Sequence, residues 1–215
     1  MENLINDTIS FVKKELENAE GGHDWFHIER VYKNAVLIAN GEKCDNLVVQ
    51  LGALLHDIAD SKFHDGDETV GPKKARLFLE SKNVSEIIIA HVVNIIENIS
   101  FKGGHEVKKF TSLELDIVQD ADRLDAIGAI GVARTFNYGG FKNRAIYNPE
   151  IQPNLKMSKE EYKNSDAPTI NHFYEKLLLL KNKMNTITGR EIATQRHDFM
   201  ERFLNQFFAE WNGEK

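Results

Sequence analysis

The most restrictive feature of the sequence is an apolar run that ends abruptly in ionisable residues. The run covers Leu47–Leu55 with one strongly polar member, and His56, Asp57 and Asp60 follow it. An apolar run of this kind predicts a buried helix, here over residues 44–60. At helical spacing Asp60 lies one turn beyond the His-Asp pair and on the same ridge.

Two interpretations fit this helix end. Buried imidazoles and carboxylates are costly unless they are paired, hydrogen-bonded or bound to a metal, and a divalent cation is the simplest common partner for three such groups. A solvated C-terminal turn of the helix accounts for the same residues. The segment alone is compatible with both interpretations, and other polar residues on apolar helical faces are needed to distinguish them.

A second histidine occupies an apolar helical face earlier in the chain. Asp24 is a plausible N-cap, and His27, Val31, Ala35 and Ile38 then fall on one side of the predicted helix. A histidine on such a face is more often a satisfied core residue than a metal ligand. That balance changes if another helix brings a His-Asp pair to the same place.

A third polar anomaly follows near residue 120. Asp122 shares one helical face with Val118, Ala126 and Ala129, a stripe of small residues that allows a neighbouring helix to approach closely. A core carboxylate paired with Arg123 would give the same pattern. Two other acidic residues compete for the same role, and periodicity does not choose among the three. The competitors are Asp120 and Asp125.

Composition limits the protein class. The 215 residues suit one domain, and only four prolines are present, which favours long helices. The net charge of −6 argues against a nucleic-acid polymer as partner, because such binding needs a basic face. Cys44 is the only cysteine, so neither an intrachain disulfide nor a cysteine zinc cluster is expected. No signal peptide or membrane span is evident, and a cytoplasmic location is the expectation.

Further helices are predicted around these motifs. Ser85 is expected to cap a helix whose inward residues are Ile87, Ile88, Val92, Ile95 and Ile96. The predicted helices cover about 2–18, 72–81, 86–98, 168–184 and 187–211.

Three local sequences carry a family resemblance. They are His27-Ile-Glu-Arg-Val31, Leu54-Leu-His-Asp-Ile58 and Ala121-Asp-Arg-Leu124, in the order His, His-Asp, Asp. This ordered set resembles the HD superfamily of metal-dependent phosphohydrolases over roughly residues 20–135. The stretch Asp120–Gly131, with His23-Asp24-Trp25 upstream, resembles the small bacterial stand-alone HD hydrolases.

The resemblance implies an all-α, HD-domain helical bundle. Residues 1–215 would form a single domain, with helices over 168–211 packing on the motif core. It also implies one divalent metal ion, which could be Mn, Mg, Co, Ni, Fe or Zn, because ligand type does not select among them. The implied ligands are His27, His56, Asp57 and Asp122, the last preferred to Asp120 for its Ala-Asp-Arg-Leu context.

The implied activity is hydrolysis of a small phosphorylated substrate, a nucleotide or a related ester or anhydride, by a metal-activated water. Asp57 and Asp60 are the implied catalytic residues; Asp60 would orient or deprotonate the water, or else hold a ligating histidine. Phosphate contacts are expected from basic residues. The candidates are Lys62, Lys102, Arg134 and Arg190.

Two rival functions stay open. One is a non-catalytic sensor that binds metal or nucleotide, and the other is a di-iron oxygenase on the same fold. The oxygenase needs a second metal, for which His91 and His105 lie in the right interval of the sequence. His105 falls in a predicted loop, so the resemblance is not extended to a two-metal site. Oligomeric state is not predicted.

Overall fold

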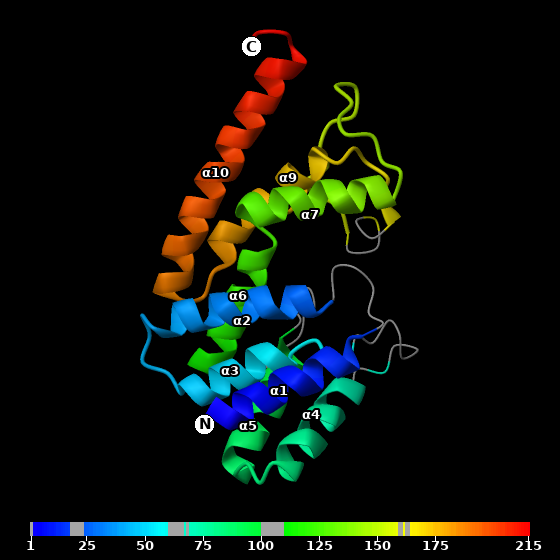
Figure 1. Ribbon diagram of the computed structural model, residues 1–215. Helices are drawn as coiled ribbons and strands as arrows, with labels where there is room; N and C mark the ends of the chain where they lie inside the picture. Colours follow the sequence, from blue (N-terminus) through cyan, green and yellow to red (C-terminus); the bar gives the residue numbers. More distant parts are fainter. Residues whose placement is uncertain are drawn as a thin grey trace. The chain divides into compact units, whose positions relative to one another are not determined.

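The computed structural model describes residues 2–17, 24–59, 67, 69–99, 110–158, 161 and 164–215. Over these residues the chain forms helices and no strand (Figure 1), which confirms the all-α prediction. The chain divides into two compact units, Met1–Asp122 and Arg123–Lys215. That residues 1–215 act as a single domain, with 168–211 packed on the motif core, remains a prediction. None of the described helices is long and apolar enough to cross a membrane.

The first unit is built around one buried helix, α3. Its elements are α1 (Glu2–Glu15), α2 (Trp25–Ala39), α3 (Asn46–Leu55), α4 (Val70–Ser81), α5 (Glu86–Asn98) and α6 (Leu113–Asp125) as far as Asp122. Helix α3 packs against α1, α2 and α5 (Figure 1). Gly52 lets α5 and α6 approach, because a Cβ there would lie 3.3 Å from Ile95 and 3.4 Å from Val118. The continuous apolar run is explained by contacts on several sides.

Helix α3 is shorter than predicted, because it ends at Leu55 rather than near residue 60. His56 is its C-cap, and the His56 Nδ1 lies 2.8 Å from the carbonyl oxygen of Ala53. That oxygen is the acceptor that the N–H of Asp57 would use in a continuing helix. The predicted extension of the helix to residue 60 is therefore wrong, and the predicted position of Asp60 lies outside the described residues.

Helix α5 has the predicted bounds but not the full predicted face. Ser85 occupies the N-cap position without a side-chain capping hydrogen bond. Ile89, Val92 and Ile95 are buried, whereas Ile87 is 84% exposed. Ile87 lies about 200° around the helix from Ile89, so it cannot share the buried face, and its predicted inward position is wrong.

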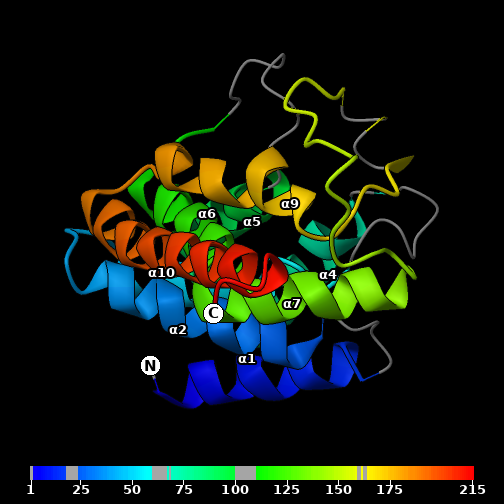
Figure 2. The same cartoon turned by 90° about the horizontal axis from the view of Figure 1, so that it is seen from above.

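The second unit continues from the end of α6. Its elements are α7 (Gly128–Phe141), α9 (Asn171–Glu175), the 3-10 helix η2 (Leu177–Lys183) and α10 (Ile187–Trp211). Helix α10, red in Figures 1 and 2, packs against α7 and η2. The helix predicted over 187–211 is confirmed, whereas the one predicted over 168–184 is replaced by the short α9 and η2.

A sharp break separates α6 from α7. Gly128 has φ +75°, which favours glycine, and a Cβ on Gly131 would lie 2.3 Å from the carbonyl oxygen of Ala126. The chain thus turns where the sequence pattern suggested one continuous face from Val118 to Ala129. That part of the prediction is wrong, because the two glycines permit a backbone turn that apolar periodicity does not reveal.

Candidate metal centre

His27 is positioned by the start of α2. The predicted N-cap is confirmed, because the Asp24 Oδ1 accepts a hydrogen bond of 2.9 Å from the backbone N–H of His27. The side chain lies on the apolar face that also buries Ile28 and Val31, and His27 is only 4% exposed. The cap and the buried face together fix where this imidazole lies.

His56 is positioned by the end of α3, and its hydrogen bond defines the tautomer. It is 8% exposed, and its Nδ1 lies 2.8 Å from the Ala53 carbonyl oxygen. Because a carbonyl oxygen only accepts, Nδ1 carries the proton in the neutral ring, and Nε2 carries the lone pair. A metal-binding histidine needs this orientation from a partner that is not itself a ligand.

These two histidines and Asp57 converge. Each of the three offers one potential ligand atom, and these atoms lie within 4.8 Å of one another. The rings of His27 and His56 meet edge to face, with centroids 5.5 Å apart. The Oδ1 of Asp122 lies 3.6 Å from the Nε2 of His27, which brings the fourth predicted ligand to the same histidine.

A buried amide connects the helices that carry His27 and Asp122. The Asn34 Nδ2, on α2, donates a hydrogen bond of 3.2 Å to the carbonyl oxygen of Ala121, on α6. Sequence analysis missed Asn34, although a polar residue seven positions after His27 on an apolar face is a readable signal. Its bond fixes the backbone of α6 next to Asp122.

The donor atoms suit a divalent cation. Two imidazoles and carboxylate oxygens form a mixed nitrogen and oxygen set, compatible with several divalent metals. Buried imidazoles that lie close to a carboxylate gain from a cation between them. The possible His/Asp site therefore agrees with the predicted cofactor, and nothing in its donor set selects one metal.

His91 is not brought to this cluster. Its Nε2 lies 2.9 Å from the Ser112 Oγ and 3.4 Å from a Glu114 carboxylate oxygen. The other Glu114 oxygen accepts from the backbone N–H of Asp45, the N-cap of α3. His91 therefore lies towards the start of α3, whereas His56 lies at its end, about 15 Å along the axis. His105 lies outside the described residues.

The predicted phosphate-binding residues have varied surroundings. Arg134, in the second unit, donates to a carboxylate oxygen of the buried Asp125 at 2.7 Å. Arg190 is exposed, and its Nη2 donates to the Met184 carbonyl oxygen at 3.2 Å. Lys62 and Lys102 lie outside the described residues. The phosphate contacts stay predictions.

One histidine of the second unit has a strongly shifted pKa. Burial is the largest cause that lowers the pKa of His172, and together with the charges of Lys176 and Arg144 it brings the pKa to about 4. The sequence showed these residues only as basic, and their effect on the imidazole required the fold. His172 is neutral at physiological pH.

Comparisons with known proteins agree with this architecture. The HD domain family model matches residues 25–127. The crystal structure of an HD-superfamily hydrolase from Bacillus thuringiensis is 44% identical, covers 98% of both chains and has a TM-score of 0.80. Bacillus subtilis YpgQ is 38% identical over 92% of this chain and 88% of its own. A crystal structure of YpgQ in complex with ADP aligns over 97% and 95% of the two chains, at 32% identity and a TM-score of 0.74.

Together, the helical fold and the ordered histidine and aspartate residues define a stand-alone HD-domain protein. The chain belongs to the HD superfamily of hydrolases.

Proposed function

We propose that the protein is a divalent-metal-dependent phosphohydrolase acting on a nucleotide or a related small phosphate ester or anhydride. The observation that carries this proposal is the convergence of His27, His56 and Asp57, with Asp122 beside His27. The ADP complex of the relative YpgQ supports a nucleotide as the substrate.

His27, His56, Asp57 and Asp122 would hold the metal. When bound, a divalent ion lowers the pKa of a water molecule and neutralises phosphate charge. The Ala53 carbonyl keeps the proton of His56 on Nδ1, and burial keeps bulk water from competing at both imidazoles. Asp57 and Asp60 are proposed to orient the attacking water and to accept its proton.

Lys62, Lys102, Arg134 and Arg190 are proposed to contact substrate phosphate. For Arg134 the ion pair with Asp125 offers a different role, in stabilising the second unit. The two roles differ in their consequences, because a phosphate contact affects KM and an internal ion pair affects stability. Arg134→Met should be measured for both.

The decisive experiment uses metal-stripped protein and a panel of nucleotides and phosphate esters. Mn, Mg, Co, Ni, Fe or Zn is added back singly, and phosphate and pyrophosphate are separated as products. His56→Ala and Asp57→Ala should abolish turnover while the helical circular dichroism persists, and His91→Ala is the matched control. Full activity in His56→Ala would refute the proposal. Nucleotide binding without turnover under every metal would instead favour a sensor.

A second matched pair tests the choice between two aspartates on α6. Asp120 is fully buried, whereas the side chain of Asp122 is 45% exposed and approaches His27. Asp122→Asn should weaken metal binding by about 10- to 100-fold or more. Asp120→Asn should mainly lower stability. The reverse pattern, measured by metal titration and urea unfolding, would assign the ligand to Asp120.

A further inference from the structure

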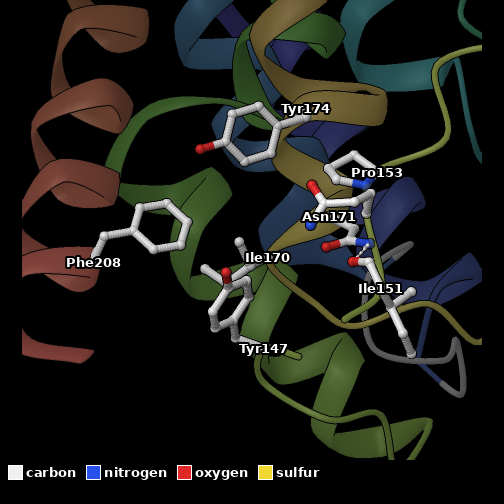
Figure 3. A pocket seen from close by; sticks show the side chains of 8 residues that line it. Tyr147, Ile151, Pro153, Ile170, Asn171, Tyr174 and Phe208 are labelled. Atoms are coloured by element: carbon white, nitrogen blue, oxygen red, sulfur yellow. Dashed lines mark hydrogen bonds between the residues drawn. The ribbon is translucent and has the colours of Figure 1, made fainter. Parts of the chain in front are cut away.

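The second unit contains a cavity of about 290 Å³ that the metal chemistry does not use. Figure 3 shows side chains from the α7–α9 connection, α9 and α10 surrounding it. This volume lies at the small end of the range for ligand pockets. Its lining residues are Tyr147, Ile151, Gln152, Pro153, Ile170, Asn171, Tyr174 and Phe208.

Aromatic rings form much of the wall. Tyr147 and Phe208 meet edge to face, with centroids 5.3 Å apart. Burial raises the pKa of Tyr174, and the nearby Tyr147 phenol raises it further, which agrees with two phenols facing the same space. Flat walls of this kind suit a planar ring, which can stack on them or meet their edges.

Asn171 supplies a directed polar group. It is 1% exposed, and its Nδ2 donates a hydrogen bond of 3.0 Å to the Ile151 carbonyl oxygen (Figure 3). Because that carbonyl can only accept, the atom facing it must be the amide nitrogen. The Oδ1 of Asn171 accepts no hydrogen bond within the described part of the chain. An acceptor in a cavity wall can receive a hydrogen bond from a ligand that enters the cavity.

No charged side chain is among the eight lining residues. A phosphate or carboxylate would therefore find no cation among these described residues, whereas a neutral ring would lose little on desolvation. A side-chain amide oxygen pairs well with the exocyclic amino group of adenine. The walls, the acceptor and the absence of charge in the lining all select a neutral planar heterocycle that carries an amino group.

We propose that this cavity binds an amino-bearing nucleobase, with adenine the best match, between its aromatic walls and the Asn171 Oδ1. The proposal does not depend on the phosphohydrolase function, because neither a metal nor a phosphate enters the argument.

The binding test uses metal-free full-length protein and adenosine as the probe. Trp211 can report binding, because its ring centroid lies 5.0 Å from that of Tyr147, and Trp25→Phe removes the other tryptophan. Adenosine should saturate one site in fluorescence and calorimetry. Purine riboside, which lacks the amino group, should bind about 10-fold more weakly. Failure of adenosine to saturate, or equal affinity for the two nucleosides, would overturn the proposal.

Variants test the location. Ile151 is 45% exposed, so Ile151→Trp can fill the cavity without entering the core, and it should weaken adenosine binding at least about 10-fold. Phe208→Ala should weaken binding too, whereas Phe199→Ala, on the same helix outside the cavity, should not. Unchanged adenosine binding in a folded Ile151→Trp variant would refute the site. If that variant does not fold, equal adenosine binding by Phe208→Ala and Phe199→Ala would refute it.

A comparison of AMP with adenosine tests whether the phosphate of a nucleotide contributes to binding. AMP should bind as tightly as adenosine, because none of the described residues that line the cavity carries a positive charge. AMP binding about 10-fold tighter would contradict a site that contacts the base alone.

Discussion

Two adjacent glycines on α7 provide a matched test of packing in the second unit. A Cβ on Gly139 would lie 2.2 Å from the Thr169 Oγ1 and 3.1 Å from its Cγ2, whereas a Cβ on Gly140 would meet nothing within 4 Å. Thr169 cannot easily move away, because it is 3% exposed and its backbone N–H donates to the Ala145 carbonyl oxygen at 2.9 Å. Gly139→Ala should therefore be destabilising and Gly140→Ala should not.

The expected difference in the free energy of unfolding between the two variants follows from two opposing effects. Replacing a helical glycine by alanine stabilises by up to about 1 kcal/mol, and this term is similar at the two neighbouring positions. Overpacking costs about 1–3 kcal/mol and applies to Gly139 alone. The free energy of unfolding should thus differ by about 1–3 kcal/mol between the two variants.

Urea unfolding followed by circular dichroism measures this difference, provided that the m-value is unchanged. Thr169→Ala should rescue Gly139→Ala, because it removes the two atoms in closest conflict, and a double-mutant cycle should show a favourable coupling of about 1 kcal/mol or more. Equal stability of Gly139→Ala and Gly140→Ala would refute the reasoning.

Three further predictions concern charge and metal. The pKa of His172 is depressed to about 4 in the folded protein, so on acidification the unfolded state is protonated first. The free energy of unfolding should therefore fall by roughly 3 kcal/mol as the pH decreases from about 6.5 to 4. Urea unfolding at a series of pH values measures this fall, and His172→Asn should reduce it. Mn²⁺ at 100 times its Kd should increase the free energy of unfolding by about 2.7 kcal/mol and so raise the melting temperature. His56→Ala should show no such rise, and an equal rise in that variant would place the metal elsewhere. Arg134→Met should cost about 1–3 kcal/mol in urea unfolding, because it removes a partner of the buried Asp125, and an unchanged midpoint would argue against this role.

The sequence was most informative where a single periodicity governed a whole helix. Helix α10 follows its predicted range closely, and Asp24 caps α2 as predicted. The end of α3 was not predictable from periodicity, because it depends on the bond between the His56 ring and the Ala53 carbonyl. The α6–α7 turn likewise depends on backbone contacts at Gly131, where alanine would not fit.

The choice among the aspartates shows a deeper limit of periodicity. Asp120 and Asp122 are separated by about 200° on an α-helix, so a single buried face should not include both. Yet Asp120 is fully buried, and Asp122 is turned to His27 at 3.6 Å. Helix α6 is covered on more than one side, so a side chain that points inward from it can face either the apolar core or the neighbouring imidazole. Periodicity measures only burial, whereas a ligand is defined by the atoms that it faces. Local sequence context favoured Asp122, and the distance of its carboxylate from His27 agrees with that preference, whereas its assignment as a ligand stays a prediction.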